Sequence, residues 1–288
     1  MILRYNNESE KTINSILKNN LDVSSRLLTK LINMKRVYLN DKIVDTRTVA
    51  KINDVISIDF NYEEDNSNIL PCKMDLDIVY EDEAFLIINK PAGISIHPSI
   101  LHYSDSLSNG VRYYYDSINL KKKIRPVNRL DLNTSGLVVF AKNEYIQECL
   151  IKQMLNDTFK KEYLALVSGI PNKSAGTINA PISRKKGSII ERCISEDGQK
   201  SITHFEVIKT FKEYSLVKCI LETGRTHQIR VHMSYIGHSL IGDSLYGQKS
   251  DLINRHALHC HKLSFIHPIT KKQLEFVCNL PKDINDLI

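Results

Sequence analysis

The sequence predicts an α+β fold with an antiparallel or mixed sheet, in two units joined by a short linker. Strand-like and helix-like segments interleave after residue 74 without forming a regular βαβ repeat. No glycine-rich loop of the kind that cradles phosphates in doubly wound folds occurs in the sequence. Residues 61–68 are polar, acidic and free of periodicity, which marks a boundary. We therefore expect a small α+β domain at 1–60, a linker at 61–73 and a large domain at 74–288.

The composition is that of an ordinary folded protein, with 42% hydrophobic and 25% charged residues among 288. No apolar run approaches the roughly 20 residues needed to cross a bilayer, so we expect no membrane partner. The first residues lack the apolar core of a secretory signal, and we expect the cytoplasm. The six cysteines are scattered without a C-x-x-C pair, as reduced thiols are. We expect a monomer.

Positive charge is concentrated in the small N-terminal domain. Residues 1–60 hold ten Lys/Arg and seven Asp/Glu, so +3 of the net charge of +6 lies there. Ser24 is a good N-cap for a helix with an apolar side, and that helix carries a cationic stripe. A hairpin at 37–44 and a strand at 55–60 follow. The helical stripe and its C-terminal extension consist of Arg26, Lys30, Lys35 and Arg36.

The large domain begins with strands at 76–80 and 85–90, and a partly helical, tyrosine-rich segment follows at 99–124. An amphipathic helix is predicted at 143–156 and a strand at 160–167. Residues 176–200 have the small and cationic residues of a loop. Alternation predicts strands at 203–211 and 214–222. A helix at 227–236 would be capped by Thr226 and stopped by Gly237, with Arg225 at its mouth and free to point into a cleft.

Asp131 lies on a polar turn, two residues after Arg129 and shortly before the apolar run 137–140. A carboxylate on a turn between ordered elements is well placed for function, because a rigid scaffold holds an exposed group. The local alternative is a hairpin turn in which Asp131 and Asn133 only cap backbone groups. The local pattern alone favours the turn cap, so a functional role for Asp131 needs support from other parts of the chain.

A histidine-rich segment near the C-terminus raises the question of a metal site. A strand would send His259 and Cys260 to opposite faces, and no cysteine pair completes a ligand set. We therefore predict no metal site. The segment contains His256, His259, Cys260, His261 and His267.

Residues 11–60 resemble the RNA-binding module named after ribosomal protein S-four. The matching stretches are 21–26 (LDVSSR), 36–40 (RVYLN) and 53–56 (NDVI). The alternative is a small helical domain with a solvated charged face. The resemblance implies that four cations contact phosphates, which contributes affinity but no sequence choice. They are Arg26, Lys30, Lys35 and Arg36.

Four motifs in the large domain occur in order: 90–93 (KPAG), 129–137 (RLDLNTSGL), 160–165 (KKEYLA) and 224–232 (GRTHQIRVH). Over roughly residues 74–281 the chain resembles the RluA-type pseudouridine synthases. It departs from the family pattern at Asn128, where the family commonly has His.

The resemblance implies a catalytic domain with a central cleft that converts uridine to pseudouridine in structured RNA, without cofactor or metal. Ribosomal RNA is favoured over transfer RNA, and the large subunit over the small. Asp131 would be the nucleophile, and Tyr163 would pack on the flipped-out base and serve in proton transfer. Arg225 would pair with the carboxylate. Arg129 would bind phosphate or support the loop.

Two other classes of protein stay open. A non-catalytic RNA-binding or ribosome-assembly protein would tolerate Asp131→Asn, whereas a synthase would lose turnover. A glycosidic-bond hydrolase usually needs two facing carboxylates, and the matched motifs supply no second acid beside Asp131.

Overall fold

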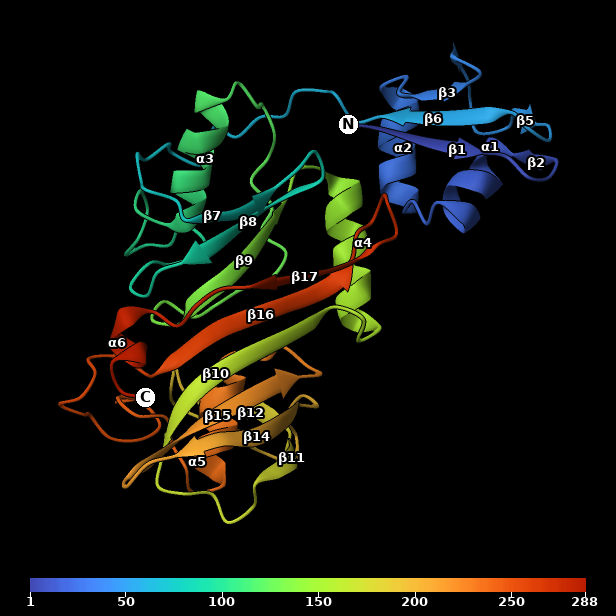
Figure 1. The fold of residues 1–288 in the computed structure, drawn as a ribbon. Helices are drawn as coiled ribbons and strands as arrows, with labels where there is room; N and C mark the ends of the chain where they lie inside the picture. The colour runs from blue at the N-terminus through green and yellow to red at the C-terminus, as the bar shows by residue number, and fades with distance from the viewer.

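The computed structural model describes residues 1–288 and is built around one long mixed sheet (Figure 1). Its strands follow the order β11-β14-β15-β10-β16-β9-β8-β7, and β17 pairs with β16. Every pairing in it is antiparallel except that of β16 with β9. The mixed sheet expected of the large domain is confirmed. The strands are β7 (Ile78–Glu81), β8 (Phe85–Lys90), β9 (Ser135–Ala141), β10 (Lys160–Ser168), β11 (Ala175–Asn179), β14 (Ile202–Thr210), β15 (Tyr214–Leu221), β16 (Leu258–Ile266) and β17 (Gln273–Val277).

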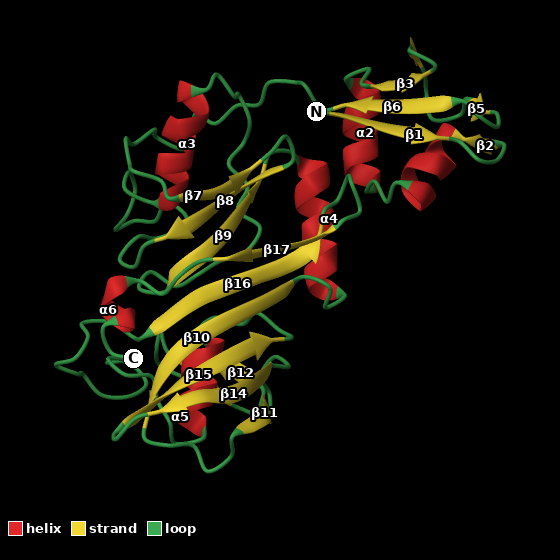
Figure 2. Ribbon diagram, viewed as in Figure 1, coloured by secondary structure: helices red, strands yellow, loops and turns green.

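Helices accompany this sheet along its length (Figure 2). The helix expected at 143–156 is α4, and Asn143 caps it by accepting a hydrogen bond from the backbone N–H of Ile146 at 3.0 Å. The helix α5 packs beside β14 and the short strand β13 (Arg192–Ile194). The helices of the large domain are α3 (Leu107–Ser117), α4 (Glu144–Leu155), α5 (Gln228–Tyr235) and α6 (Lys282–Asn285). None of the helices in the protein is both long and apolar enough to span a bilayer.

The first sixty residues form a four-stranded sheet in the order β1-β6-β3-β4, at one end of the molecule (Figure 1). The predicted hairpin is confirmed as β3 and β4, and Asn40 and Asp41 between them both have positive φ angles. Such angles fit the tight turns that join twisted strands. The elements are β1 (Ile2–Asn6), β2 (Lys11–Thr12), α1 (Ile13–Ser15), a π-helical turn (Ile16–Asn20), α2 (Ser25–Asn33), β3 (Val37–Leu39), β4 (Lys42–Ile43), β5 (Val49–Ala50) and β6 (Val55–Asp59).

The expected linker at 61–73 has no helix or strand, but its backbone is hydrogen-bonded to later residues, with the N–H of Glu64 donating to the carbonyl of Lys121 at 2.9 Å. Arg125 holds the side chain of Glu64 through two hydrogen bonds of 2.8 and 2.6 Å. The rings of Phe60 and Tyr145 stack with centroids 5.6 Å apart. One hydrophobic core runs through both parts of the chain. The two units are therefore docked by buried contacts.

Two local predictions differ from the structure. The expected loop at 176–200 contains β11 and a hairpin of β12 (Ile182–Arg184) and β13 (Arg192–Ile194). These strands are short and rich in polar residues, so their order comes from pairing and not from an alternating pattern. Thr226 does not cap α5: His227 occupies the N-cap position, with a left-handed backbone (φ 59°). The side chain of Gln228 satisfies the backbone N–H of Arg225 instead.

A close approach between two neighbouring parallel strands fixes the position of the Asp131 turn within the sheet. All seven residues of β9 are buried, and β9 runs parallel to β16 from Ser135 and Gly136. A Cβ atom at Gly136 would lie 2.3 Å from the carbonyl oxygen of Cys260, and Gly136 has φ 115°. Only glycine fits this approach. The close approach places the turn before β9 next to the segment that leads into β16, and β10 lies on the other side of β16.

Candidate active site

Asp131 lies on a turn whose backbone is tied down on both sides. The N–H of Thr134 donates to the carbonyl of Asp131 at 3.1 Å, which closes the turn. The carbonyl of Leu132 accepts from the N–H of Gly93 at 2.9 Å and from the buried Lys90 ammonium at 3.0 Å. The Asp131 carboxylate itself stays 26% exposed. The turn therefore presents an accessible acid from a fixed backbone.

Arg230 is the cation that faces this carboxylate. Its Nη1 lies 3.4 Å from Asp131 Oδ2, and its Nε and Nη2 bind Asp243 at 2.7 and 2.9 Å. Burial alone would lower the pKa of Arg230, but hydrogen bonds and charge from Asp243 and Asp131 raise it. Burial would raise the pKa of Asp243, yet Arg230 holds it below its ordinary value. A buried guanidinium thus joins the exposed acid to a second acid behind it.

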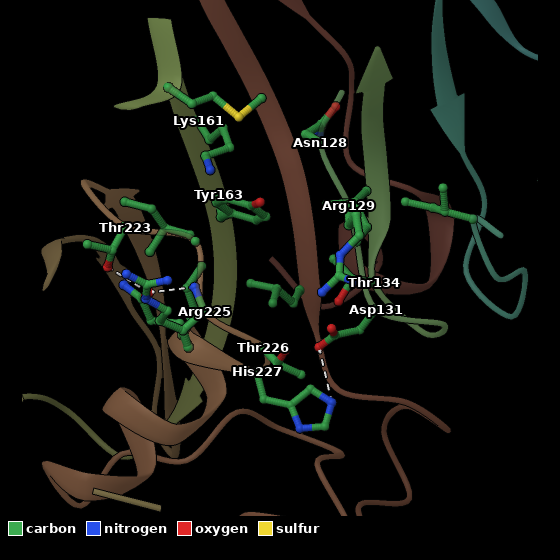
Figure 3. Close-up of a pocket in the computed structure, with 18 of the residues that line it drawn as sticks. Asn128, Arg129, Asp131, Thr134, Lys161, Tyr163, Thr223, Arg225, Thr226 and His227 are labelled. Atoms are coloured by element: carbon green, nitrogen blue, oxygen red, sulfur yellow. Dashed lines mark hydrogen bonds and ion pairs between the residues drawn. The ribbon is translucent and has the colours of Figure 1, made fainter. Parts of the chain in front are cut away.

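The expected pairing of Arg225 with Asp131 is wrong. Arg225 precedes α5, its side chain is exposed, and its Nε donates to the carbonyl of Lys200 at 3.2 Å. Figure 3 shows Arg225 across the cavity from Asp131. Arg230 lies in the first turn of α5, on the side of the helix that faces Asp131. The motif contains both arginines, and only the position at which the helix begins decides which of them reaches the acid.

His227 is a further residue at the site, and the sequence did not indicate a role for it. Its Nε2 lies 3.8 Å from Asp131 Oδ2 (Figure 3), and its Nδ1 shares a 2.8 Å hydrogen bond with the hydroxyl of Tyr246. Burial lowers the pKa of His227, and the charge of Asp131 offsets part of that shift. A left-handed backbone at a residue other than glycine is uncommon and is often found at functional sites. No sequence signal separates this histidine from a structural one.

Asp131 opens onto a cavity of about 740 Å³, within the usual range for ligand sites. Its walls include Tyr163, Lys161, Arg129 and His97. Burial raises the pKa of the Tyr163 phenol well above its ordinary value, so the phenol stays protonated near neutral pH. Figure 3 shows the Tyr163 ring between the Arg225 and Asp131 sides of the cavity. The cavity therefore brings together three residues from separate motifs, Asp131, Tyr163 and Arg225.

Asn128, the departure from the family pattern, binds the backbone of β9. Its Nδ2 donates to the carbonyl of Leu137 at 3.0 Å, and its Oδ1 accepts from the N–H of Val139 at 2.9 Å. The residue is buried. It therefore fastens the segment that leads into the Asp131 turn.

The histidines considered as metal ligands are engaged in separate hydrogen bonds. His256 bonds to the hydroxyl of Thr134 at 2.8 Å. Burial lowers the pKa of His256, and likewise of His259, to about 4, so both are neutral at pH 7. The other bonds join His259 to Ser135 and Cys278, His261 to the carbonyl of Cys278, and His267 to Asp82.

The four cations expected to bind phosphate in the N-terminal domain divide into two pairs. Lys30 forms ion pairs with Glu144 and Glu64, and Arg36 binds Asp59 at 2.6 Å. Arg26 and Lys35 are exposed. Helix α2 ends at Asn33, so Lys35, with φ 55°, and Arg36 lie beyond the helical stripe.

The fold is that of the pseudouridylate synthase domains. A solved structure, human RNA Pseudouridylate Synthase Domain Containing 1, aligns with a TM-score of 0.60 at 28% identity and covers 71% of this chain and 83% of its own. The chain belongs to the RNA pseudouridylate synthase family, whose model matches residues 84–235. The protein is therefore an RNA pseudouridine synthase.

Curated relatives match over most of their lengths. The uncharacterized RNA pseudouridine synthase YjbO of Bacillus subtilis (strain 168) is 41% identical over 269 residues, which covers 93% of this chain and 95% of the relative. Ribosomal large subunit pseudouridine synthase D of Zymomonas mobilis is 39% identical over 229 residues, covering 74% of this chain and 72% of the relative.

Proposed function

We propose that the protein isomerises specific uridines to pseudouridine in large-subunit ribosomal RNA, with Asp131 as the nucleophile and without a cofactor. The observation that carries the aspartate assignment is the Asp131 carboxylate facing Arg230, 3.4 Å away, at the wall of the cavity. The carboxylate is part exposed, so a nucleotide can reach it, and the guanidinium is nearly buried, so it holds a fixed position.

The reaction exchanges one bond of the sugar for another. The bond from C1′ to N1 of uracil breaks, the ring reorients, a bond from C1′ to C5 forms, and the proton lost from C5 is balanced by one gained at N1. A carboxylate can form a transient covalent adduct that divides this exchange into easier steps. Arg230 suits it as a partner because a guanidinium does not lose its proton in proteins. Asp131 is released when the new bond is complete.

Tyr163 is the aromatic residue available to the base. A uridine must leave its stack to reach Asp131, which costs a few kcal/mol, and stacking on an aromatic ring offsets part of that. The raised pKa of the Tyr163 phenol keeps it protonated near neutral pH, so it can donate a hydrogen bond but gives up its proton reluctantly. We therefore assign it to stacking and to hydrogen-bond donation.

Exposed cations around the cavity suit the RNA backbone. Arg129 and Arg225 both line the cavity and are exposed. Since Arg225 lies away from Asp131, we move it from the role of carboxylate partner to that of a phosphate or base contact at the rim. In the N-terminal domain we narrow the phosphate contacts to Arg26 and Lys35, because Lys30 and Arg36 are already engaged in ion pairs.

The choice of target rests on relatives. Several curated relatives are named ribosomal large subunit pseudouridine synthase D, including one from Buchnera aphidicola that is 36% identical and aligns with 97% of this chain. A basic N-terminal domain also fits a large structured RNA. A purely RNA-binding function is not favoured, because the chain belongs to an enzyme family.

A glycosidic hydrolase is also not favoured. Such enzymes need a second carboxylic acid that donates or accepts a proton. The acid nearest to this arrangement, Asp243, is almost completely buried and bound to Arg230, which keeps its pKa low. It therefore stays ionised and cannot serve as a general acid.

Asp131→Asn is the direct test. We expect pseudouridine formation on ribosomal RNA lacking the modification to fall by at least about 1000-fold, while the Kd for RNA stays within about two-fold. Asp116→Asn, a distant exposed carboxylate on α3, serves as the control. Normal turnover by Asp131→Asn would overturn the aspartate assignment. An unchanged pseudouridine map of large-subunit RNA in a strain lacking the gene would overturn the target.

A further inference from the structure

The turn after Asp131 is held by a segment that lies beyond the matched family range of 84–235. Arg255 Nη1 donates to the carbonyl of Asn133 at 3.0 Å, the only hydrogen bond that this carbonyl accepts within the chain. Arg255 Nη2 lies 3.4 Å from the hydroxyl of Ser135. Arg255 and Asp131 also line the same small cavity of about 200 Å³. The guanidinium thus spans the two residues on either side of Thr134.

Arg255 is itself fixed by the C-terminal helix. Asp283 of α6 accepts from its Nε and Nη2 at 2.7 and 3.0 Å. The Arg255 side chain is 7% exposed, whereas that of Asp283 is 44% exposed. The same guanidinium also donates to the carbonyls of His256 and Leu258 at the start of β16. It therefore joins three parts of the chain that are distant in sequence: the turn, the strand start and α6.

We propose that Arg255 is a positioning residue for the isomerisation, and that Asp283 acts through it. By holding the Asn133 carbonyl, Arg255 fixes the turn that presents the Asp131 carboxylate to Arg230. This inference rests on the proposed role of Asp131.

The physical reason is the lack of regular structure in the turn. Strand β9 begins only at Ser135, so residues 131–134 have no sheet partner on either side. The Leu132 side chain is 39% exposed, so the turn is held through its backbone, at the Leu132 carbonyl by Lys90 and at the Asn133 carbonyl by Arg255. Removing Arg255 frees the Asn133 carbonyl and lets the turn move relative to α5. A displacement of about 1 Å at a reacting group can cost about 100-fold in rate.

The test measures the single-turnover rate of pseudouridine formation and the Kd for RNA separately, at 25 °C, in variants of the full chain. Arg255→Met removes the hydrogen bonds, and Arg255→Lys keeps a cation with fewer donors. Asp283→Asn weakens the ion pair that holds Arg255, and it does so at a part-exposed residue. Asp116→Asn is the matched control, because Asp116 is 42% exposed and accepts hydrogen bonds from Nε of Arg112, and Arg112 likewise donates to a backbone carbonyl, that of Asn66.

We expect the rate to fall by about 100-fold in Arg255→Met, about ten-fold in Arg255→Lys and about five-fold in Asp283→Asn. The Kd for RNA should change less than about two-fold in each, and Asp116→Asn should match the wild type. In the Arg255→Met background, Asp283→Asn should add nothing, because it acts through Arg255. If Arg255→Met does not fold, the rates of the Arg255→Lys and Asp283→Asn variants test the positioning role of Arg255.

Wild-type rates in Arg255→Lys and Asp283→Asn would overturn the proposal, and so would equal losses in Asp283→Asn and Asp116→Asn. A rate that falls only together with RNA binding would also overturn it, since that indicates general loosening. Asp131→Asn is measured alongside. If Asp131→Asn is active, the nucleophile assignment has failed. If Asp131→Asn is inactive and the Arg255 variants are normal, only the positioning role has failed.

Discussion

The cleft beside Asp131 and residues 1–60 both carry cations that sequence motifs assign to binding, but the cation that pairs with a carboxylate does so within the cleft in one region and across to the rest of the chain in the other. In the cleft, the motif arginine expected to face the acid, Arg225, is exposed, and Arg230 is buried against Asp131 and Asp243. In the N-terminal domain, Lys30 of the cationic stripe is turned onto the large domain's Glu144. The difference lies in which carboxylate each cation can reach.

A motif therefore identifies the residue types at a site but not their partners. An arginine beside a buried acid is drawn inward, because an unpaired buried charge is costly. A lysine near a carboxylate on the other part of the chain forms an ion pair with it and is then unavailable to RNA. The ion pair offsets the entropy lost when the lysine side chain is immobilised. The cations left exposed, Arg129 and Arg225 in the cleft and Arg26 and Lys35 in the N-terminal domain, are the ones available to RNA.

The largest expected effect separates the two cleft arginines. Arg230→Gln should lower the rate of pseudouridine formation by about 100-fold or more, because Asp131 loses the cation that faces it. It should also cost about 3–5 kcal/mol of stability, since Asp243 is left buried without a partner. Arg225→Gln should cost less than about ten-fold, seen mainly in the Kd for RNA. Single-turnover rates, RNA binding and urea unfolding measure these quantities. Equal rate losses in the two variants would contradict the assignment of Arg230.

A pH titration of stability should distinguish the two domains. All ten histidines lie at or after residue 97, so histidine-linked instability belongs to the large domain. Burial, with a further contribution from Arg230, lowers the pKa of His256 to about 4. The folded state therefore binds fewer protons than the unfolded state between about pH 4 and 6.5, and stability is lost as the pH falls through this window.

His256→Gln should reduce this acid loss without abolishing it, because His259 has a similarly low pKa. Melting temperatures at several pH values between 4 and 7 measure the effect. If the melting temperature of His256→Gln falls with pH as steeply as that of the wild type, His256 does not contribute to the acid loss of stability. The N-terminal carboxylates Asp45 and Asp54 should respond only at lower pH, since backbone and side-chain hydrogen bonds lower their pKa.

The smallest expected effect concerns salt. If Arg26 and Lys35 contact phosphates, replacing both with Gln should reduce the slope of log K against log salt by about 1.5 to 2. Lys11→Gln with Lys51→Gln, at the β2–β5 end of the same domain, removes the same charge and should leave the slope nearly unchanged. Lys30→Gln should also leave it unchanged, because Lys30 is paired with Glu144. If Lys30→Gln instead reduces the slope of log K against log salt, Lys30 contacts phosphate after all.

Much of the fold could be predicted from local pattern. The apolar spacing predicted α4, and the alternation at 203–222 predicted β14 and β15. The hairpin β12–β13 could not be predicted in this way, because its order comes from pairing across a cationic loop. The left-handed N-cap at His227 could not be predicted either, because no local sequence pattern distinguishes it from the Thr226 cap that the sequence favoured.

The sequence by itself determined which chemical groups the site contains, because the motifs carrying Asp131, Tyr163 and the two arginines are continuous in the chain. Only the tertiary structure decided how these groups pair. Arg230 and Asp131 are 99 residues apart in sequence, and Arg255 and Asn133 are 122 apart. Their contacts depend on where α5 begins and on the register of β9 with β16. A shift of one residue in either would turn a different side chain toward Asp131.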